Sequence, residues 1–119
     1  MQLRLKTYLI SKEDFVAIME INVVPIGTGK TSVSNYVVDA VKVLERRGLK
    51  HLVGPMSTVA EGPLNELFDA AREMHEEVFA GGDVMRAITS LRIDDRRDIE
   101  ENTMERKVKS LKEKVKYKK

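Results

Sequence analysis

The chain of 119 residues contains no cysteine and only two histidines, His51 and His75. Disulfide bonds and thiolate zinc sites are therefore excluded, and a histidine-rich metal site is not expected. Aromatic residues make up 5% of the chain, and the first and last predicted core strands contain none, which argues against a sheet that stacks nucleic-acid bases. No apolar run approaches the roughly 20 residues that a membrane-spanning helix needs. We expect a protein that uses no metal or other cofactor and binds neither nucleic acid nor a membrane.

The length fits a single domain. Residues 104–119 carry eight basic and two acidic side chains, whereas the chain before them is net acidic. We interpret this basic end as a solvated helix, because nucleic-acid binding needs a coherent basic face. Residues 1–15 are expected to form an N-terminal extension, either a strand or disordered, before one domain at 16–119. The extension lacks the apolar core and cleavage site of a signal peptide, so we expect a cytoplasmic protein.

Apolar residues alternate or recur at helical spacing in seven segments. The first half of the chain predicts a strand over 16–24, then a helix that Thr31 or Ser32 caps and Gly48 ends, and then two short strands within 49–61. The second half predicts a helix with Pro63 at its first position and a strand over 84–94. A last helix follows, which Asn102 caps together with Glu105. This order predicts an α+β fold, a βαββαβ sandwich with an additional C-terminal helix.

Two of these helices carry apolar stripes that differ in width. The second helix is expected to bury a stripe that includes Phe68. The third helix has only a narrow seam, which suits contact with a neighbouring subunit or a sheet edge rather than a core. The seam consists of Met104, Val108, Leu111 and Val115.

Two helices can cover only one face of a four-stranded sheet. The other face is expected to carry Ile18, Glu20, Asn22, Val24, Arg86, Ile88, Ser90 and Arg92. Exposed Ile and Val favour an association surface, although a solvated face with scattered aliphatic residues is the alternative. If the first and last strands are neighbours, Glu20 can pair with Arg86 or Arg92.

The segment Gly27-Thr28-Gly29-Lys30-Thr31-Ser32 lies between a strand and a helix, as a phosphate-binding loop does. A Walker A loop, however, needs a glycine five residues before Gly29, and Val24 occupies that position. Nucleotide hydrolysis is therefore not expected. Two interpretations remain, a weak anion site at a helix start and a plain strand-to-helix turn.

Two acidic segments have a structural and a functional interpretation each. Glu61 precedes a helix, where a carboxylate is favoured by the helix dipole, but it can equally hold a cationic or amine-bearing ligand. The segment from Asp94 to Asp98 fits a solvated turn with internal ion pairs better than a cation or acid–base site. Arg96 or Arg97 within it can meet an anion or a carboxylate of another subunit.

Four blocks in this order resemble the small thiamine-binding, YkoF-like protein family: Val23 to Gly29, Thr31 to Ser34, Gly54 to Gly62 and Ile93 to Asp98. The resemblance covers roughly residues 16–115. It implies a ferredoxin-like fold, dimers whose sheets pair, and a homotetramer built from two dimers. It also implies that thiamine or its hydroxymethylpyrimidine moiety is the ligand.

The resemblance and the residue chemistry together give two competing hypotheses. The first is a non-catalytic protein that binds thiamine or hydroxymethylpyrimidine at a subunit boundary, with a cationic ring near Tyr36. Its candidate ligand-binding residues are Asn22, Ser57, Thr58, Glu61, Ser90, Arg92 and Asp94. The second is an oligomeric regulatory protein that senses a phosphate- or sulfate-type anion. Its candidate residues are Gly27, Thr28, Thr31, Ser32, Arg96 and Arg97.

Overall fold

A computed structural model of the chain describes residues 15–118. In this part of the chain the predicted order of elements is confirmed. The elements are β1 (Ala17–Ile26), α1 (Ser34–Arg46), β2 (Lys50–Val53), β3 (Thr58–Gly62), α2 (Leu64–Glu77), β4 (Arg86–Asp94) and α3 (Met104–Lys118). The strand considered for residues 1–14 lies outside the described residues.

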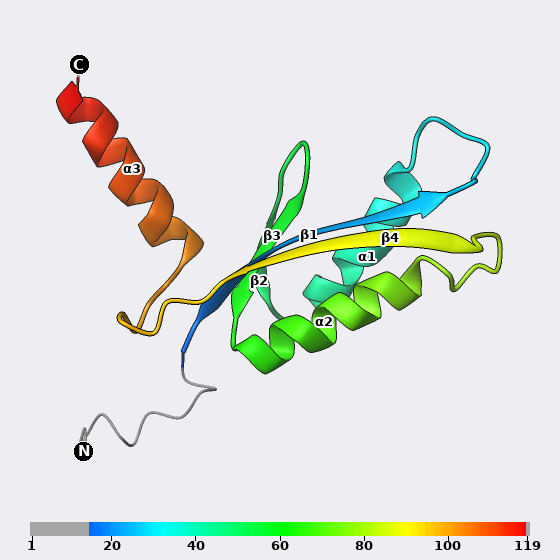
Figure 1. Cartoon of the computed structure of the whole chain (residues 1–119), viewed down its shortest axis with the longest axis horizontal. Helices are drawn as coiled ribbons and strands as arrows, with labels where there is room; N and C mark the ends of the chain where they lie inside the picture. The colour runs from blue at the N-terminus through cyan, green and yellow to red at the C-terminus, as the bar shows by residue number, and fades with distance from the viewer. Residues whose placement is uncertain (1–14, 119) are drawn as a thin grey trace.

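The four strands form one antiparallel sheet in the order β2-β3-β1-β4. Helices α1 and α2 pack side by side on one face, and α3 stands apart from them (Figure 1). This is the α+β, ferredoxin-like arrangement that the sequence predicts. Strand β1 pairs with β4 from Ile18 to Ile26, but with β3 only from Ala17 to Ile21. Among residues 15–118, therefore, residues 22–26 of β1 have a strand neighbour on one side only.

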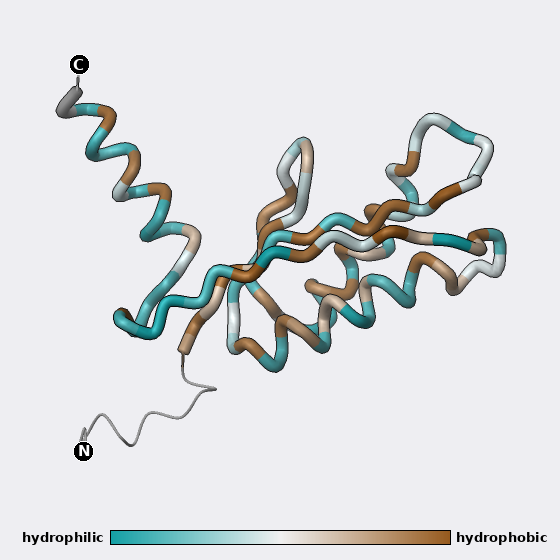
Figure 2. The backbone as a smooth tube through the Cα atoms, viewed as in Figure 1, coloured by the Kyte–Doolittle hydropathy of each residue, from teal (hydrophilic) through white to brown (hydrophobic). Residues whose placement is uncertain are grey.

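Alternation along β1 decides which of its side chains fill the core. Met19, Ile21 and Val23 are buried and face the helices, whereas Asn22 between them is exposed on the other face. Each buried aliphatic side chain of this size contributes about 1.5–3 kcal/mol relative to an exposed one. Brown and teal segments accordingly alternate along the sheet in Figure 2. The period-two pattern was thus a sufficient guide to the two faces.

Helix α2 departs from its prediction at two positions. Pro63 takes the N-cap position rather than the first helical position. Phe68 is 49% exposed, so its assignment to the buried stripe was wrong. Leu67 and Met74 do fill the core, but Phe68 is rotated about 100° from Leu67 around the helix and does not belong to the core cluster.

The start of α1 also differs from its prediction, while its end agrees. Val33 occupies the N-cap and makes no side-chain capping bond, so neither Thr31 nor Ser32 is the cap. The Ser32 hydroxyl lies one residue too early and accepts a long hydrogen bond of 3.4 Å from the Ser34 amide. Gly48 ends the helix with φ at +67°, a conformation that glycine adopts without strain.

The predicted cap of α3 was wrong by one residue. The Thr103 hydroxyl accepts a hydrogen bond from the Arg106 amide at 3.2 Å, as an N-cap does. Asn102 is instead 1% exposed, and its Nδ2 donates to the carbonyl of Asp94 at 3.0 Å. Asn102 therefore fastens the connection before α3 to the end of β4.

Beyond its first turn, α3 lies outside the core. Its seam residues Val108, Leu111 and Val115 are 47%, 63% and 58% exposed. Figure 2 shows α3 as a mostly teal helix with brown at intervals. This agrees with the prediction that the seam is too narrow for a core helix. Across residues 15–118, no helix combines the length and apolar character needed to span a membrane.

Candidate functional site

A cavity of about 230 Å³ lies between the β2–β3 hairpin and the outer half of β1. It forms because β3 begins at Thr58, opposite Ile21, and no strand of the described part of the chain continues beside the next residues of β1. In Figure 1 the hairpin diverges from β1 at this point. We name this space the hairpin cavity. It is lined by residues 21–24 of β1, residues 53–58 of the hairpin, Val33, Val37, Ala40 and Val41 at α1, and Met74 of α2.

Three of the seven predicted ligand-binding residues line the hairpin cavity: Asn22, Ser57 and Thr58. Thr58 is 5% exposed and lies on the helix-facing side of the sheet, in register with buried Ile21. Ser57 points elsewhere, and its hydroxyl donates to Glu20 Oε2 at 2.8 Å. An apolar wall with a few hydroxyl and amide groups suits an uncharged ring with few polar atoms.

The uncovered sheet face has the mixed character that the sequence predicts. Glu20 lies near its centre and pairs with Arg92 at 3.5 Å, which confirms one of the two expected partners. Asn22 and Ser90 are directly opposite each other across β1 and β4. Because Arg92 is 86% exposed, this ion pair contributes at most about 1 kcal/mol. The face therefore offers polar groups for recognition but gains little stability from them.

Arg92 and Asp94 share a shallow hollow of about 250 Å³ on this face, together with Glu20. This hollow is separate from the hairpin cavity, because no residue lines both. Five of the seven predicted ligand-binding residues are thus divided between these two places, and Glu61 and Ser90 line neither of them.

Glu61 and Asp94 are both candidate ligand-binding residues, but both carboxylates contact α3. Glu61 Oε1 accepts a hydrogen bond from the Met104 amide at 2.9 Å. Glu61 is thus a helix-start charge, as one interpretation predicted, although the helix is α3 rather than α2. Asp94 Oδ2 lies 2.6 Å from Lys107 Nζ. The hydrogen bond from Lys107 lowers the pKa of the Asp94 carboxyl.

We expect Lys107→Met to return the pKa of Asp94 toward the ordinary aspartate value of about 3.8. Because the folded pKa is depressed, the contact stabilises the fold above pH about 3.8 and is lost as pH falls through the lower folded pKa. An NMR titration of the Asp94 carboxyl carbon measures both midpoints. Lys109→Met, which removes a charge that has no ion pair with Asp94, is the matched control. An unchanged midpoint in Lys107→Met would show that the contact is absent in solution.

The six predicted anion-binding residues do not form one site within a chain. Residues 27–32 follow the end of β1 near Arg86, whereas Arg96 and Arg97 follow the opposite end of β4. Arg96 pairs with Asp98, and Arg97 pairs with Asp95. Those pairs fit the solvated turn that the sequence analysis favoured for this segment. The loop and the two arginines are too far apart along the sheet to hold the same anion.

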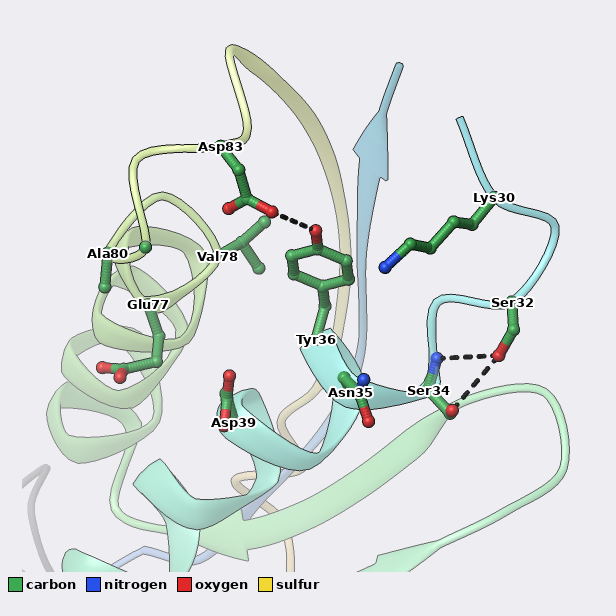
Figure 3. A pocket seen from close by; sticks show the side chains of 11 residues that line it. Lys30, Ser32, Ser34, Asn35, Tyr36, Asp39, Glu77, Val78, Ala80 and Asp83 are labelled. Carbon is green, nitrogen blue, oxygen red and sulfur yellow. Dashed lines mark hydrogen bonds between the residues drawn. The ribbon is translucent and has the colours of Figure 1, made fainter. Parts of the chain in front are cut away.

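A crevice of about 390 Å³ separates the start of α1 from the end of α2 (Figure 3). Tyr36 stands in it, and its hydroxyl donates to Asp83 Oδ2 at 2.7 Å. This hydrogen bond raises the pKa of Tyr36 and lowers that of Asp83. Asp39 and Glu77 add two further carboxylates, against the single ammonium group of Lys30. The crevice is therefore net acidic, which disfavours an anion beside Lys30.

The model of a protein family described as "Thiamine-binding protein" matches residues 19–112. The chain belongs to this family. The match spans every element from β1 into α3, so it includes the hairpin cavity, the open sheet face and the crevice. The resemblance stated from four sequence blocks is thereby confirmed.

Two relatives of this thiamine-binding family protein are similar to it over most of their own length. The UPF0045 protein MJ1052 of Methanocaldococcus jannaschii is 43% identical over 79% of this chain and 90% of its own. The UPF0045 protein YqgV of Bacillus subtilis is 41% identical over 81% of this chain and 94% of its own. Neither name states a ligand.

Solved structures of family relatives share the fold. The crystal structure of MJ1052 superimposes with a TM-score of 0.75 at 41% identity, over 82% of this chain and 97% of MJ1052. A Thermotoga maritima protein, described as a candidate thiamine biosynthesis or salvage protein, gives 0.69 at 25% identity, over 81% and 98%. The ferredoxin-like assignment therefore rests on homologous experimental structures as well as on the topology.

Several residues of the hairpin cavity were not singled out from the sequence. Val37 and Val41, four residues apart on α1, line the cavity. Their helical spacing was visible, but the missing strand opposite them was not. Asp83, the partner of Tyr36, was also overlooked, although its position directly after two glycines marked a tight turn beside the helices.

Proposed function

We propose that this protein binds thiamine or its hydroxymethylpyrimidine moiety reversibly in the hairpin cavity, without catalysis. The observation that carries the proposal is one largely apolar cavity, lined by Asn22, Thr58 and the chain at Ser57 just before β3, in a member of the thiamine-binding protein family. An enclosed space of about 150 Å³ holds a benzene ring, so about 230 Å³ has room for one substituted six-membered ring.

The chemistry of the lining supports binding rather than turnover. Among the residues that line the hairpin cavity there is no Asp, Glu, His, Lys or Tyr side chain to act as a general acid or base. Both histidines contact other groups. His75 Nδ1 lies 2.6 Å from the Thr89 hydroxyl, and His51 Nδ1 lies 2.9 Å from the Leu49 carbonyl.

The position of the cavity supports a contribution from a second copy of the chain. Asn22 is exposed on the open sheet face and also lines the cavity. Val24 and Ile88 lie beside it on that face and are 42% and 49% exposed. A sister chain on this face covers those apolar groups and closes one side of the cavity, which places the ligand at a subunit boundary.

Thr58→Val should weaken hydroxymethylpyrimidine binding about tenfold in calorimetry, because valine keeps the shape of threonine but cannot make the proposed hydrogen bond to the ligand. Thr89→Val removes a hydroxyl on the same side of the sheet but outside the cavity; it loses the contact with His75 Nδ1, so its melting temperature should fall while the affinity stays unchanged. Both variants are compared with the native protein using thiamine and hydroxymethylpyrimidine. The absence of any heat or thermal stabilisation with either compound at millimolar concentration would refute the proposed function.

A further inference from the structure

The hairpin cavity touches four consecutive residues of β1, from Ile21 to Val24. Successive side chains of a strand point to opposite faces of a sheet, so a cavity above one face meets only every second residue. A space that meets all four must open onto the edge of the strand. This is the edge that β3 leaves uncovered, since their pairing ends at the Ile21–Thr58 pair.

Pro25 shows which backbone groups face that edge. It lies within β1 and pairs in register with Ala87 of β4, although proline has no N–H to donate to a ladder. Proline is tolerated in a strand where its nitrogen faces away from the hydrogen-bonded neighbour. The nitrogen of Pro25 therefore points away from β4, toward the uncovered edge.

Backbone direction alternates along a strand just as side chains do. The N–H and C=O of Val23, two residues before Pro25, consequently point to the same uncovered edge. Beyond Ile21 no residue of β3 faces them. With no strand partner on this edge, the donor and the acceptor lie side by side and free to bind, which favours a ligand that satisfies both.

We propose that the hairpin cavity recognises its ligand through the main chain of Val23. The N–H donates to a ring nitrogen, and the C=O accepts from an exocyclic amino group on the adjacent ring carbon. The site thus selects planar heterocycles that carry an amino group next to a ring nitrogen, and such a ring takes the place of the missing stretch of β3. This inference rests on the proposed function and specifies which backbone groups of the protein bind the pyrimidine ring.

A single ring fits this edge better than an extended peptide does. The turn of the hairpin encloses the space, with the Gly54 amide donating to the Ser57 carbonyl at 2.8 Å. Gly54, Pro55 and Met56 line the cavity opposite β1. A peptide strand added along β1 would need the room that these residues occupy.

Residue-resolved hydrogen exchange by NMR on the intact chain tests this directly. In the free protein the Val23 amide should exchange at least tenfold faster than the amides of Asn22 and Val24, which face β4. Saturating hydroxymethylpyrimidine should slow Val23 at least tenfold and leave its two neighbours unchanged. Slow exchange at Val23 without ligand would overturn the inference, because the edge would then already be paired.

A ligand analogue separates this inference from the proposed function. The same pyrimidine without its amino group keeps the ring but cannot donate to the Val23 carbonyl, so it should bind about tenfold more weakly. If it binds equally well, or if the parent compound binds without protecting Val23, the main-chain recognition is wrong while pyrimidine binding stands. If the parent compound does not bind at all, both proposals fall.

Discussion

Val37→Phe should reduce the affinity for hydroxymethylpyrimidine by more than about a hundredfold, to below calorimetric detection. Val37 lies on α1 and lines the hairpin cavity opposite β1. A phenylalanine there occupies the space that the ligand ring needs. Because the side chain enters a pre-existing cavity instead of a close-packed core, the usual cost of overpacking is largely avoided and the melting temperature should change little.

Val38→Phe is the matched control for this variant. Val38 is the next residue of the same helix, is 50% exposed and does not line the cavity. It should bind the ligand as the native protein does. Undiminished binding by Val37→Phe would mean that the ligand occupies another place, such as the acidic crevice beside Tyr36.

Ile88→Asp should convert the proposed oligomer into monomers at micromolar concentration, as measured by native mass spectrometry. Ile88 lies on the open sheet face opposite Val24, and both are substantially exposed in a single chain. If a sister chain covers this face, the new carboxylate must be buried without a partner, which costs several kcal/mol for each copy. Association should therefore weaken by at least a hundredfold.

Phe68→Asp provides a control of equal exposure. Phe68 is also 49% exposed, but it lies on α2, in the layer that covers the other face of the sheet. Its replacement should leave the mass of the assembly unchanged. A native protein that is monomeric, or an Ile88→Asp variant that still associates normally, would show that the open face is not the contact between copies.

Periodicity was enough to predict the elements and the two faces of the sheet. The alternation in β1 separated buried Ile21 from exposed Asn22, and the glycine at position 48 marked the end of α1. These features depend on neighbours within a few residues along the chain. That one face of the sheet is uncovered could be predicted because only two helices are available to cover it. The Glu20–Arg92 pair could be predicted because the first and last strands are neighbours in the expected strand order.

The ends of helices and the partners of polar side chains were harder to predict. Several hydroxyl or amide residues precede α1 and α3, and sequence does not show which one adopts the cap conformation. Asn102 is buried against β4, so Thr103 caps α3 instead. Glu61 meets Met104, which is 43 residues away in the chain. Such contacts depend on the position of α3 relative to the sheet. The narrow apolar seam of α3 does not determine this position.

The hairpin cavity could not be predicted from composition or spacing. It arises from a mismatch in strand pairing, because β4 follows β1 to Ile26 while β3 stops opposite Ile21. Ser57 and Thr58 were both identified as candidate ligand residues, but Ser57 precedes β3, and successive side chains of an extended chain face opposite ways. Only the register shows that Thr58 faces the helices while Ser57 contacts Glu20.

A crystal structure of the protein grown with saturating hydroxymethylpyrimidine shows where the ligand lies. The proposed site predicts ring density between the β2–β3 hairpin and the outer half of β1, within contact of Asn22, Ser57 and Thr58. Density for the ring in the crevice beside Tyr36, on the surface of α3, or nowhere at a concentration that saturates binding in solution would contradict it.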